Sequence, residues 1–516
     1  MNTTQAAPGG WNSPARVLGL LAAWLLATPA LRPLLLPDEG RYSEVAREMF
    51  VGDGLTPTLA GLPFFHKPPL TYWVDMLGMA IFGVGHFAVR LGPTLGAWLM
   101  GAALWLAMRR WHGPRTAGIG LLALATSPFF FVGAQYANHD MLVAGMLAVA
   151  TLAIARALEP GKPQLRWLLA GWVACGLAVL SKGLIGVVLP ALVIGPWLLA
   201  QGRWRDMLRL LHPLALIAFA AVVVPWHLAM EARHPGFFDY YVVEQHFRRY
   251  AAGGFNNQQP FYFYLVVLPI LLLPWSLWLL PLLRGSLPSQ WWRQRASHTA
   301  LLAWWAAAVL LFFSAPQSKL IGYILPALAP VAGLLALSLA SGRGRQRVAV
   351  PAALACLGLV ALVGWKSPNS SRDIAATLKA QRAPADLVVL LDNPFNDLAF
   401  DAQLDRVLVA SDWADPDIPN RDNWRKELAD GARFDPLRGR EVLWPINQLA
   451  RLTCRGQTLW LVARPDLRAQ LAAVPGAVEI QAGRNSLLWR APPRDCGSDK
   501  GQPLADTATA TASTNR

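Results

Sequence analysis

LPDEGRY at Leu36–Tyr42 and FHKPP at Phe65–Pro69 are the two ends of a polar island that separates apolar segments of the chain. The island carries the carboxylates of Asp38 and Glu39 and the ammonium group of Lys67. Charged groups beside hydrocarbon are costly, and those that persist in membrane proteins are usually functional. The island therefore indicates a membrane protein with a polar site at one edge of the bilayer.

The composition supports a polytopic α-helical membrane protein. Of the 516 residues, 54% are hydrophobic and only 15% are charged, and the mean hydropathy is +0.34. Apolar runs close to the ~20 residues that span hydrocarbon recur over the first 365 positions. About eleven spans are predicted, at 16–36, 88–108, 117–134, 141–158, 167–181, 184–201, 213–231, 262–283, 298–315, 321–340 and 348–365.

The formal net charge of +15 comes largely from basic residues that are concentrated in one set of loops. These loops carry fourteen basic residues and only two acidic ones, Glu159 and Asp206; the basic residues are Arg109, Arg110, Arg115, Lys162, Arg166, Arg203, Arg205, Arg209, Arg284, Arg293, Arg295, Arg343, Arg345 and Arg347. This asymmetry is the positive-inside pattern and predicts that these loops are cytoplasmic. The alternate loops balance both signs, as expected of a site. The basic excess therefore reflects topology, and no nucleic-acid partner is expected.

The chain changes character after Trp365. A linker-like stretch, Lys366–Ser371, precedes alternating helix and strand patterns. Helices are predicted at 373–382 and 465–473, and strands at 386–392, 406–410, 458–462, 478–480 and 486–489. The expected organisation is a transmembrane core at 1–365, a small periplasmic α/β domain at 373–496 and a disordered tail at 497–516. Cys454 and Cys496 lie where oxidising conditions permit a disulfide, but the sequence leaves their pairing open.

The first outer loop is expected to contain two interfacial helices. Asp38 is well placed to begin a helix that extends through Phe50, with apolar residues at helical spacing on one face and charged residues on much of the rest. Such a helix can lie in the plane of the interface with its apolar side in lipid. Pro68–Gly83 is aromatic and too interrupted for a confident span, so it is also expected at the surface. The two helices would form a platform that presents groups to a lipid headgroup.

Two carboxylates on this side have alternative interpretations. Asp38 is either a helix cap, accepting a backbone N–H from Gly40 or Arg41, or a general base or orienting carboxylate at the membrane edge. Asp140 follows Gln135–His139 in another outer turn, where it is either a cap or a second acidic site residue.

Three lysines share the same predicted side, namely Lys67, Lys182 and Lys319. Each lies at the end of an apolar segment, where snorkelling to the interface is the ordinary explanation for a single lysine. The positive-inside bias disfavours three lysines on the outer side, and their presence there favours the hypothesis of an anion-binding site. The phosphate diester or pyrophosphate of a lipid would be the natural ligand.

The long outer loop near 231–262 contains Glu244–Tyr250, with His246 at its centre. His246, His66 and Glu244 do not have a recognised metal-ligand spacing, so hydrogen bonding is the favoured role for His246 and no metal site is predicted. The sequence has no glycine-rich nucleotide loop or P-loop, so a group donor need not be a nucleotide. No cofactor is therefore expected to be required, and the sequence gives a divalent metal no support.

The motifs resemble those of the bacterial aminoarabinose lipid A transferase and protein mannosyltransferase superfamily. The resemblance lies in DEGRYSEVAREM at Asp38–Met49 and GLPFFHKPPLTYW at Gly61–Trp73. Further pieces follow in the expected order: Asp140, Ser181–Gly183, Glu244–Arg249, Pro274–Ser276, Ser318–Leu320 and Tyr323–Pro326. Together they cover residues 16 to about 340.

The resemblance implies a GT-C membrane glycosyltransferase that takes a sugar from a polyprenyl phosphate and transfers it with inversion. By analogy, Asp38 is the catalytic carboxylate and Asp140 a second acidic site residue. The substrate-binding residues would then be Arg41, Tyr42, Lys67, Lys182, His246, Lys319 and Tyr323, with the lysines on the carrier phosphate. The expected partners are the lipid-linked donor, membrane lipids and a lipid or protein acceptor on the periplasmic side of the bacterial inner membrane.

Two departures keep the sugar and the acceptor open. His66 stands where the family commonly has a glutamate, and the aminoarabinose enzymes are expected to carry further spans where this chain has an α/β domain. Lipid A, lipopolysaccharide or another envelope glycan is the favoured acceptor, and protein O-mannosyl transfer is the alternative. Two readings of another class are a lipid-linked sugar flippase and a membrane-anchored binding module.

Overall fold

The computed structural model describes residues 13–159, 161, 164–248, 257–279, 297–340, 345–366 and 370–496, without the side chains of 246–248 and 345–346. The chain forms two compact units. We call Met1–Arg32 with Lys67–Lys366 the transmembrane unit, and Pro33–His66 with Ser367–Arg516 the α/β unit. Each is described by itself.

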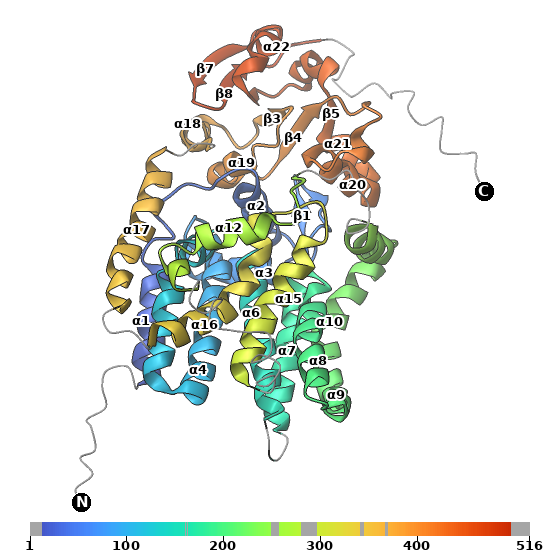
Figure 1. The fold of residues 1–516 in the computed structure, drawn as a ribbon. Helices are drawn as coiled ribbons and strands as arrows, with labels where there is room; N and C mark the ends of the chain where they lie inside the picture. Colours follow the sequence, from blue (N-terminus) through green and yellow to red (C-terminus); the bar gives the residue numbers. More distant parts are fainter. Residues whose placement is uncertain are drawn as a thin grey trace, which may run out of the picture. The chain divides into compact units, whose positions relative to one another are not determined.

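The transmembrane unit consists of helices (Figure 1). Its α-helices are α1 (Pro14–Leu26), α3 (Leu70–Phe82), α4 (Leu91–Ala125), α5 (Pro128–Gly133), α6 (Asp140–Ala157), α7 (Leu165–Lys182), α8 (Ile185–Ala200), α9 (Trp204–Leu210), α10 (Pro213–Arg233), α12 (Phe263–Leu271), α15 (His298–Ser314), α16 (Leu328–Ala340) and α17 (Ala349–Lys366). Shorter helical segments are η1 (Ala88–Arg90), η2 (Asp239–Arg248), η3 (Trp275–Trp278), η4 (Ile321–Ala327) and η5 (Arg345–Val348).

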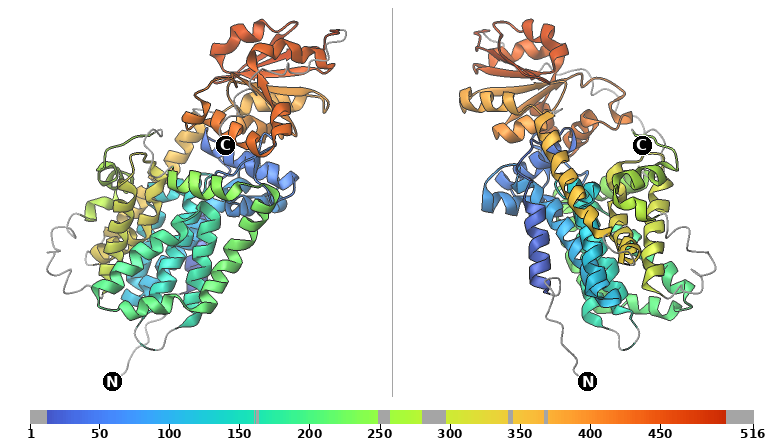
Figure 2. Two further views of the ribbon diagram at one scale, coloured as in Figure 1. Left: turned by 90° about the vertical axis from the view of Figure 1, so that its right-hand side faces the viewer. Right: turned by 60° about the vertical axis from the view of Figure 1, so that its left-hand side comes forward.

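Helix α6 lies at the centre of this unit and packs against α4, α7 and α8. Its apolar window is 83% buried, whereas those of α10 and α17 are only 22% buried. Figure 2 shows α17, coloured yellow-orange, along the side of the bundle. The exposed faces of α10 and α17 carry large apolar side chains such as Ile217, Leu228 and Leu354. An apolar outer surface around a packed centre is the arrangement expected of helices that meet lipid.

The predicted spans all contain helix in their described parts, but the count of eleven is not confirmed. Within the described residues, six helices are long and apolar enough to cross a bilayer: Ala88–Ala125, Asp140–Ala157, Leu165–Lys182, Pro213–Arg233, Ile321–Ala340 and Ala349–Lys366. Four more apolar helices, α1, α3, α8 and α15, are shorter. The span predicted at 262–283 is only partly described, and several loop arginines and lysines, among them Lys162, Arg284 and Arg343, lie outside the described residues.

A break at Gly113 divides α4 where the sequence predicts a boundary between the spans at 88–108 and 117–134. Helix α4 continues to Ala125 but is interrupted at Gly113, whose φ of 84° and ψ of 167° are not helical, and Pro114 follows. A left-handed φ is accessible to glycine without steric penalty, and proline cannot donate a helical hydrogen bond. The two predicted segments are therefore separate helices that meet at Gly113, and they fold back on each other, because a Cβ at Gly101 would lie 3.1 Å from the side chain of Leu121.

The C-terminal part of the α/β unit is an open sheet with the strand order β5-β4-β3-β6-β8-β7. Its strands are β3 (Leu387–Leu391), β4 (Val407–Ser411), β5 (Leu443–Pro445), β6 (Leu459–Ala463), β7 (Val478–Ala482) and β8 (Leu487–Ala491). Strands β5, β4, β3 and β6 are parallel, and β8 and β7 are antiparallel additions. The five predicted strands are confirmed, whereas the short edge strand β5 was not predicted.

Helical segments cover both faces of this sheet. They are α18 (Arg372–Gln381), α19 (Asn396–Ala402), η6 (Ile418–Asn420), α20 (Trp424–Phe434), α21 (Pro436–Val442), η7 (Ile446–Arg455), η8 (Pro465–Leu467) and α22 (Arg468–Ala472). Val388 and Leu390 of β3 share a core with residues of α18 and α19, and the alternate residue Val389 shares the opposite core with η7 and α22. This alternation follows from the two-residue period of a strand, so the sheet is buried on both sides.

The helix predicted at Asp38–Phe50 forms as α2 (Asp38–Val51), but its expected position in lipid is corrected. Val45, Ala46 and Met49 are buried, and α2 packs against α19 within the α/β unit. The charged pair Glu44–Arg47 is also buried there, with two guanidinium–carboxylate contacts of 2.7 Å. The short strands β1 (Thr58–Leu59) and β2 (Leu62–Pro63) belong to the same unit. Residues 33–66 therefore belong to the α/β unit, whereas the expected core of 1–365 included them, and the interfacial platform is not confirmed.

Two further expectations concern α3 and the cysteines. Helix α3, expected at the membrane surface, packs on η1, α4 and α7 and leaves Leu77, Ile81 and Phe82 exposed on its other side. Cys454 and Cys496 are joined by a disulfide with their Cα atoms 5.4 Å apart, so the pairing that the sequence left open is made. The predicted tail at 497–516 lies outside the described residues.

Candidate active site

An ion pair between Asp140 and Lys182 joins the ends of two central helices. Asp140 is the first residue of α6 and Lys182 is the last residue of α7, and these helices pack along each other. Lys182 Nζ contacts Asp140 Oδ1, and the two side chains are only 14% and 11% exposed. A carboxylate at a helix N-terminus and an ammonium group at a C-terminus are each favoured by the helix dipole. The pair is therefore stabilised by its own helices as well as by mutual attraction.

Two residues shape the surroundings of the Asp140 carboxylate. Asn138 Nδ2 donates to Asp140 Oδ2 at 3.2 Å, and Asn138 Oδ1 accepts the Asp140 backbone N–H at 2.9 Å. Gly322 of η4 packs so closely that a Cβ atom there would collide with Asp140 Oδ2. These contacts fix the carboxylate in one orientation. The sequence analysis assigned no role to either Asn138 or Gly322.

Tyr323 completes this cluster. Lys182 Nζ lies 4.4 Å from the centroid of the Tyr323 ring, a cation–π geometry, and the ring packs against Phe313 with centroids 5.4 Å apart. We call Asp140, Lys182, Tyr323, Asn138 and Gly322 the carboxylate–lysine cluster. Three of its members were predicted as site residues from separate parts of the sequence. The fold brings those three together.

Lys319 is held by backbone carbonyl groups. Its Nζ donates to the carbonyls of Gln259, at 2.8 Å, and Pro316, and the residue is 3% exposed. Its backbone N–H donates to the Asn257 carbonyl at 3.0 Å. An ammonium group surrounded by carbonyls clamps two chain segments together. This is where the structure places the third lysine predicted to bind phosphate.

The remaining predicted residues of the transmembrane unit occupy less defined positions. Lys67 is half-buried and precedes α3. On α3, the Tyr72 ring lies edge-on to His139 with centroids 5.0 Å apart, which connects α3 to the turn before Asp140. His246 lies in η2, but its side chain is outside the described set. His66 belongs to the α/β unit, where its ring stacks on Phe64 at 4.9 Å.

Asp38 forms a second charged network, within the α/β unit. Its Oδ1 accepts from the Arg41 guanidinium at 2.6 Å, and Arg41 also contacts Glu427 of α20 and the hydroxyl of Tyr42 at 3.2 Å. Pro37 occupies the N-cap position of α2 and Asp38 is the first residue of the helix, so the alternative in which Asp38 is the cap is corrected. The Asp38 side chain remains 34% exposed. Sequence reasoning could not find Glu427, because it lies 386 residues from Arg41.

A metal centre has no support among the side chains that the structure describes. No group of three or more His, Cys, Asp and Glu side chains in this part of the chain is arranged to hold a metal ion. The described clusters hold opposite charges in pairs, Asp140 with Lys182 and Asp38 with Arg41. Such pairs can bind an anion and a polar hydroxyl or ammonium group by exchange of partners.

Comparison with known proteins supports the resemblance read from the motifs. The family model described as dolichyl-phosphate-mannose-protein mannosyltransferase matches residues 66–228. The chain is similar to the undecaprenyl phosphate-alpha-4-amino-4-deoxy-L-arabinose arabinosyl transferases of Erwinia tasmaniensis, at 34% identity over 61% of this chain and 57% of that protein, and Pseudomonas aeruginosa, at 35% identity over 58% and 55%. The chain thus spans little more than half the length of these relatives.

A solved structure matches nearly the whole chain. The crystal structure of ArnT from Cupriavidus metallidurans bound to undecaprenyl phosphate has a TM-score of 0.79 and 24% identity, covering 95% of this chain and 100% of that chain. This likeness establishes the fold of a multi-pass membrane protein with a C-terminal α/β unit. The α/β unit therefore belongs to the shared fold, and the departure expected at this point of the sequence is corrected. The resemblance to the aminoarabinose transferases is confirmed.

Proposed function

We propose that this chain transfers a sugar from a polyprenyl phosphate to an acceptor on the periplasmic side of the bacterial inner membrane. The observation that carries the proposal is the carboxylate–lysine cluster at the ends of α6, α7 and η4. Its ionisable residues begin or end membrane helices, whereas a transporter tends to place such groups near the middle of the bilayer. This position favours surface chemistry over the flippase reading.

Lys182 is suited to stabilise the departing carrier phosphate. Its largely buried ammonium group is paired with Asp140 and faces the ring of Tyr323. When the bond between the anomeric carbon and the phosphate oxygen breaks, negative charge grows on the phosphate, and a fixed ammonium group lowers that barrier. The phosphate replaces Asp140 as the counterion of Lys182. The Asp140 carboxylate is then available to the sugar or the acceptor. Lys67 is proposed as a further phosphate contact, and His246 as a hydrogen-bond donor to substrate. Lys319, whose Nζ donates to the Gln259 and Pro316 carbonyls, is proposed to contact the phosphate only when it gives up those bonds.

Asp38 is proposed as the carboxylate that acts on the acceptor. In an inverting transfer the acceptor oxygen attacks the anomeric carbon from the side opposite the leaving phosphate. If the acceptor is a hydroxyl, Asp38 accepts its proton. If the acceptor is a phosphate, no proton is lost and Asp38 orients it. Arg41, which contacts Asp38, and Tyr42, which contacts Arg41, are proposed as the neighbouring substrate-binding residues.

The names of the relatives suggest the donor to try first. Undecaprenyl phosphate-linked 4-amino-4-deoxy-L-arabinose is the donor in the names of the relatives at 34–36% identity. Lipid A is the acceptor we propose for it. The family model over residues 66–228 supports protein O-mannosyl transfer as the second candidate.

The test is transfer by the purified full chain in detergent, with the aminoarabinosyl donor and lipid A, and the product measured by mass spectrometry. Asp140→Asn and Lys182→Met should each lower turnover by roughly 10²–10³-fold, the usual effect of removing a charge-stabilising group. Asp38→Asn should abolish transfer without loss of folded protein.

Glu159→Gln is the matched control, because it removes a carboxylate that pairs with Arg110 and Arg156 just beyond the other end of α6. That end is about 27 Å from Asp140 at a rise of ~1.5 Å per residue. Normal turnover by Asp140→Asn would contradict the proposal. Transfer from a mannosyl donor only would support the second candidate.

A further inference from the structure

An open cavity of about 560 Å³ lies at one edge of the sheet in the α/β unit. Its lining residues are Leu387, Arg406, Cys454, Arg455, Gly456 and Gln457. Leu387 begins β3, Arg406 directly precedes β4, and Gln457 lies two residues before β6. Three parallel strands therefore open on this cavity with their amino-terminal ends.

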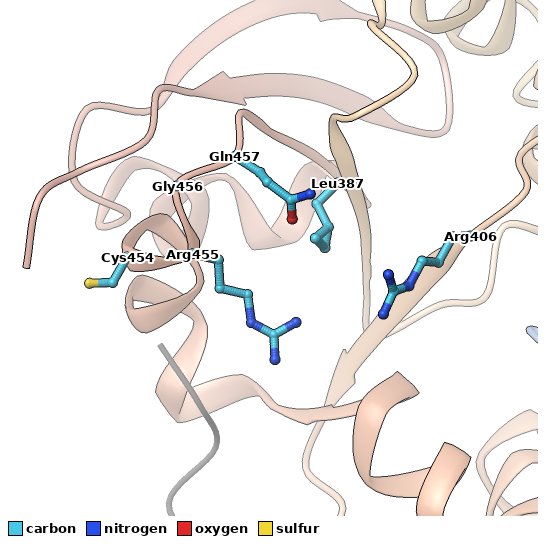
Figure 3. Close-up of a pocket in the computed structure, with 6 residues that line it drawn as sticks. All are labelled: Leu387, Arg406, Cys454, Arg455, Gly456 and Gln457. Carbon is cyan, nitrogen blue, oxygen red and sulfur yellow. The ribbon is translucent and has the colours of Figure 1, made fainter. Parts of the chain in front are cut away.

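Two arginines supply the charge of the cavity, and none of its six lining residues is acidic. Figure 3 shows the side chains of Arg406 and Arg455 directed into the same space from two separate elements. Arg406 is exposed, whereas Arg455 is half-buried. Burial, together with the neighbouring Arg406 guanidinium, lowers the pKa of Arg455, and Glu441 offsets this only in part. An anion between the two guanidinium groups would reduce their mutual repulsion.

The position of Arg455 is built into the fold. Its guanidinium lies 4.8 Å from the ring of Trp444, whose own indole N–H donates to the Gln448 carbonyl at 3.1 Å. Cys454, the preceding residue, is tied to Cys496 by the disulfide, and Gly456, the following one, has a left-handed φ of 73°. Arg455 is thus held between a covalent link, a sharp turn and an aromatic face.

The cavity also offers other polar groups to a ligand. Gln457 Nε2 donates to the Ala385 carbonyl at 3.0 Å, which fixes the amide so that its oxygen remains to accept a hydrogen bond. The space beside Gly456 is open, with no atom within 4 Å of a Cβ placed there. A ligand with an anionic group and hydroxyl donors would contact the arginines and Gln457 together.

We propose that this cavity is a binding site for a phosphate monoester, with Arg406 and Arg455 as its two guanidinium ligands. Arginine binds phosphate in a planar, bidentate manner, and two guanidinium groups can share the oxygens of one phosphate. The site lies entirely within the α/β unit and is separate from the carboxylate–lysine cluster. It does not rest on the proposed transferase function, because binding can be measured without any sugar donor.

The test uses the full chain in detergent, with inorganic phosphate titrated and its ³¹P line broadening measured at fixed ionic strength. Arg406→Gln and Arg455→Gln should each weaken the measured binding by about tenfold or more, since a charge-assisted hydrogen bond contributes ~1.5–3 kcal/mol. Arg406→Lys, which keeps the positive charge but loses the bidentate guanidinium group, should retain part of the phosphate binding. Any phosphate that binds at Lys182 binds equally in all these variants. The binding at the proposed site is therefore the difference in phosphate binding between wild type and the arginine variants.

Arg464→Gln is the matched control. Arg464 follows β6 at the opposite end of that strand and pairs with Asp466 at 3.0 Å. Its removal should leave phosphate binding unchanged. Equal phosphate binding by wild type, Arg406→Gln and Arg455→Gln would overturn the proposal, and so would an equal loss in Arg464→Gln.

A second titration, with glucosamine 1-phosphate, distinguishes the source of the ligand. Glucosamine 1-phosphate is added to the chain with inorganic phosphate bound. If it displaces the phosphate at a concentration at least about tenfold below the concentration at which inorganic phosphate itself binds, the ligand is a phosphorylated glycan headgroup. Equal competition would identify free phosphate as the ligand. Either result supports the site, whereas failure of both probes to bind would overturn it.

Discussion

At the scale of single residues, the Asp140 carboxylate is defined by neighbours distant in sequence. Asn138 is two residues away, but Lys182 and Gly322 come from other helices. The sequence indicated Asp140 and Lys182 as separate candidates. Their pairing depends on the antiparallel packing of α6 on α7, which places a helix start beside a helix end.

Gly322 tests how tightly this carboxylate is held. Gly322→Ala places a methyl group where Asp140 Oδ2 lies, so the carboxylate must turn away from Lys182. We expect transfer activity to fall at least about tenfold, because small displacements of catalytic groups have large effects. Turnover is the measurement, and Gly358→Ala on α17, where a Cβ meets no atom within 4 Å, is the control. Equal activity of both variants would show that the close approach is unimportant.

Asp397 predicts a pH dependence of stability in the α/β unit. Its Oδ2 accepts the Ser371 N–H at 2.6 Å, its Oδ1 has no hydrogen-bond partner among the described residues, and burial raises its pKa to about 7. The folded state therefore holds this proton more tightly than the unfolded state, whose pKa is ~3.9. Stability should fall as the pH rises from about 4 to about 7 and then level off.

Asp397→Asn should remove this part of the pH dependence. The measurement is hydrogen-exchange protection of β3 and β6, corrected for the intrinsic effect of pH, between pH 5 and pH 7.5. The exposed Asp373 provides the control variant Asp373→Asn, which should retain the wild-type slope. An unchanged slope in Asp397→Asn would contradict the assignment.

At the scale of elements, the crossing of α4 and α6 depends on two glycines. A Cβ at Gly96 would collide with the backbone at Met141 and Leu142, and one at Gly145 would collide with the backbone of Gly96. Small residues permit such close approach between membrane helices, where packing rather than water drives association. The sequence analysis did not identify this crossing, because a glycine within an apolar run does not reveal its partner.

Gly145→Val should separate these helices. Backbone atoms cannot yield as a flexible side chain can, so we expect destabilisation of roughly 1–3 kcal/mol or more. Thermal unfolding in detergent measures it, and transfer activity should fall in parallel because Asp140 begins α6. Gly19→Ala on α1, with no atom within 4 Å of the new Cβ, should leave the unfolding temperature unchanged or slightly higher.

Element prediction worked best where the pattern was local. The strands at 387–391 and 459–463 are continuous apolar runs with buried residues on both faces, as expected for parallel strands. Strand β5 was not predicted, because it has only three residues and ends in Pro445, which is too short for a recognisable strand pattern. Helix α2 was predicted with nearly correct bounds. The pattern of apolar residues on one face does not determine whether lipid or protein covers that face.

At the scale of the whole molecule, the α/β unit is assembled from two distant segments. Arg41 meets Glu427, the Phe65 ring packs edge-on against Phe434, and Gly431 lies against Pro63. The Cys454–Cys496 disulfide adds a covalent link near the end of the second segment, across a sequence separation of 42 residues. Closing a loop of that length is worth about 4 kcal/mol in the chain-entropy model.

Reduction of this disulfide should therefore destabilise the α/β unit and leave the transmembrane unit unaffected. Hydrogen exchange of β6 and β8, with and without a reductant, measures the effect. Cys454→Ser combined with Cys496→Ser should reproduce the reduced state, and the reductant should then have no further effect. The buried free thiols Cys175 and Cys356 lie in the transmembrane unit and serve as the internal reference.

Hydropathy, charge asymmetry and strand periodicity established the membrane class, the position of most helices and the C-terminal sheet, because these properties depend on residues close together in the chain. The motifs also marked Asp38, Asp140 and Lys182. Tertiary structure alone decided that Asp140 pairs with Lys182, that Arg41 pairs with Glu427 and that residues 33–66 belong to the α/β unit. Each of these depends on contacts between segments tens to hundreds of residues apart, and no local pattern encodes which charge will meet which.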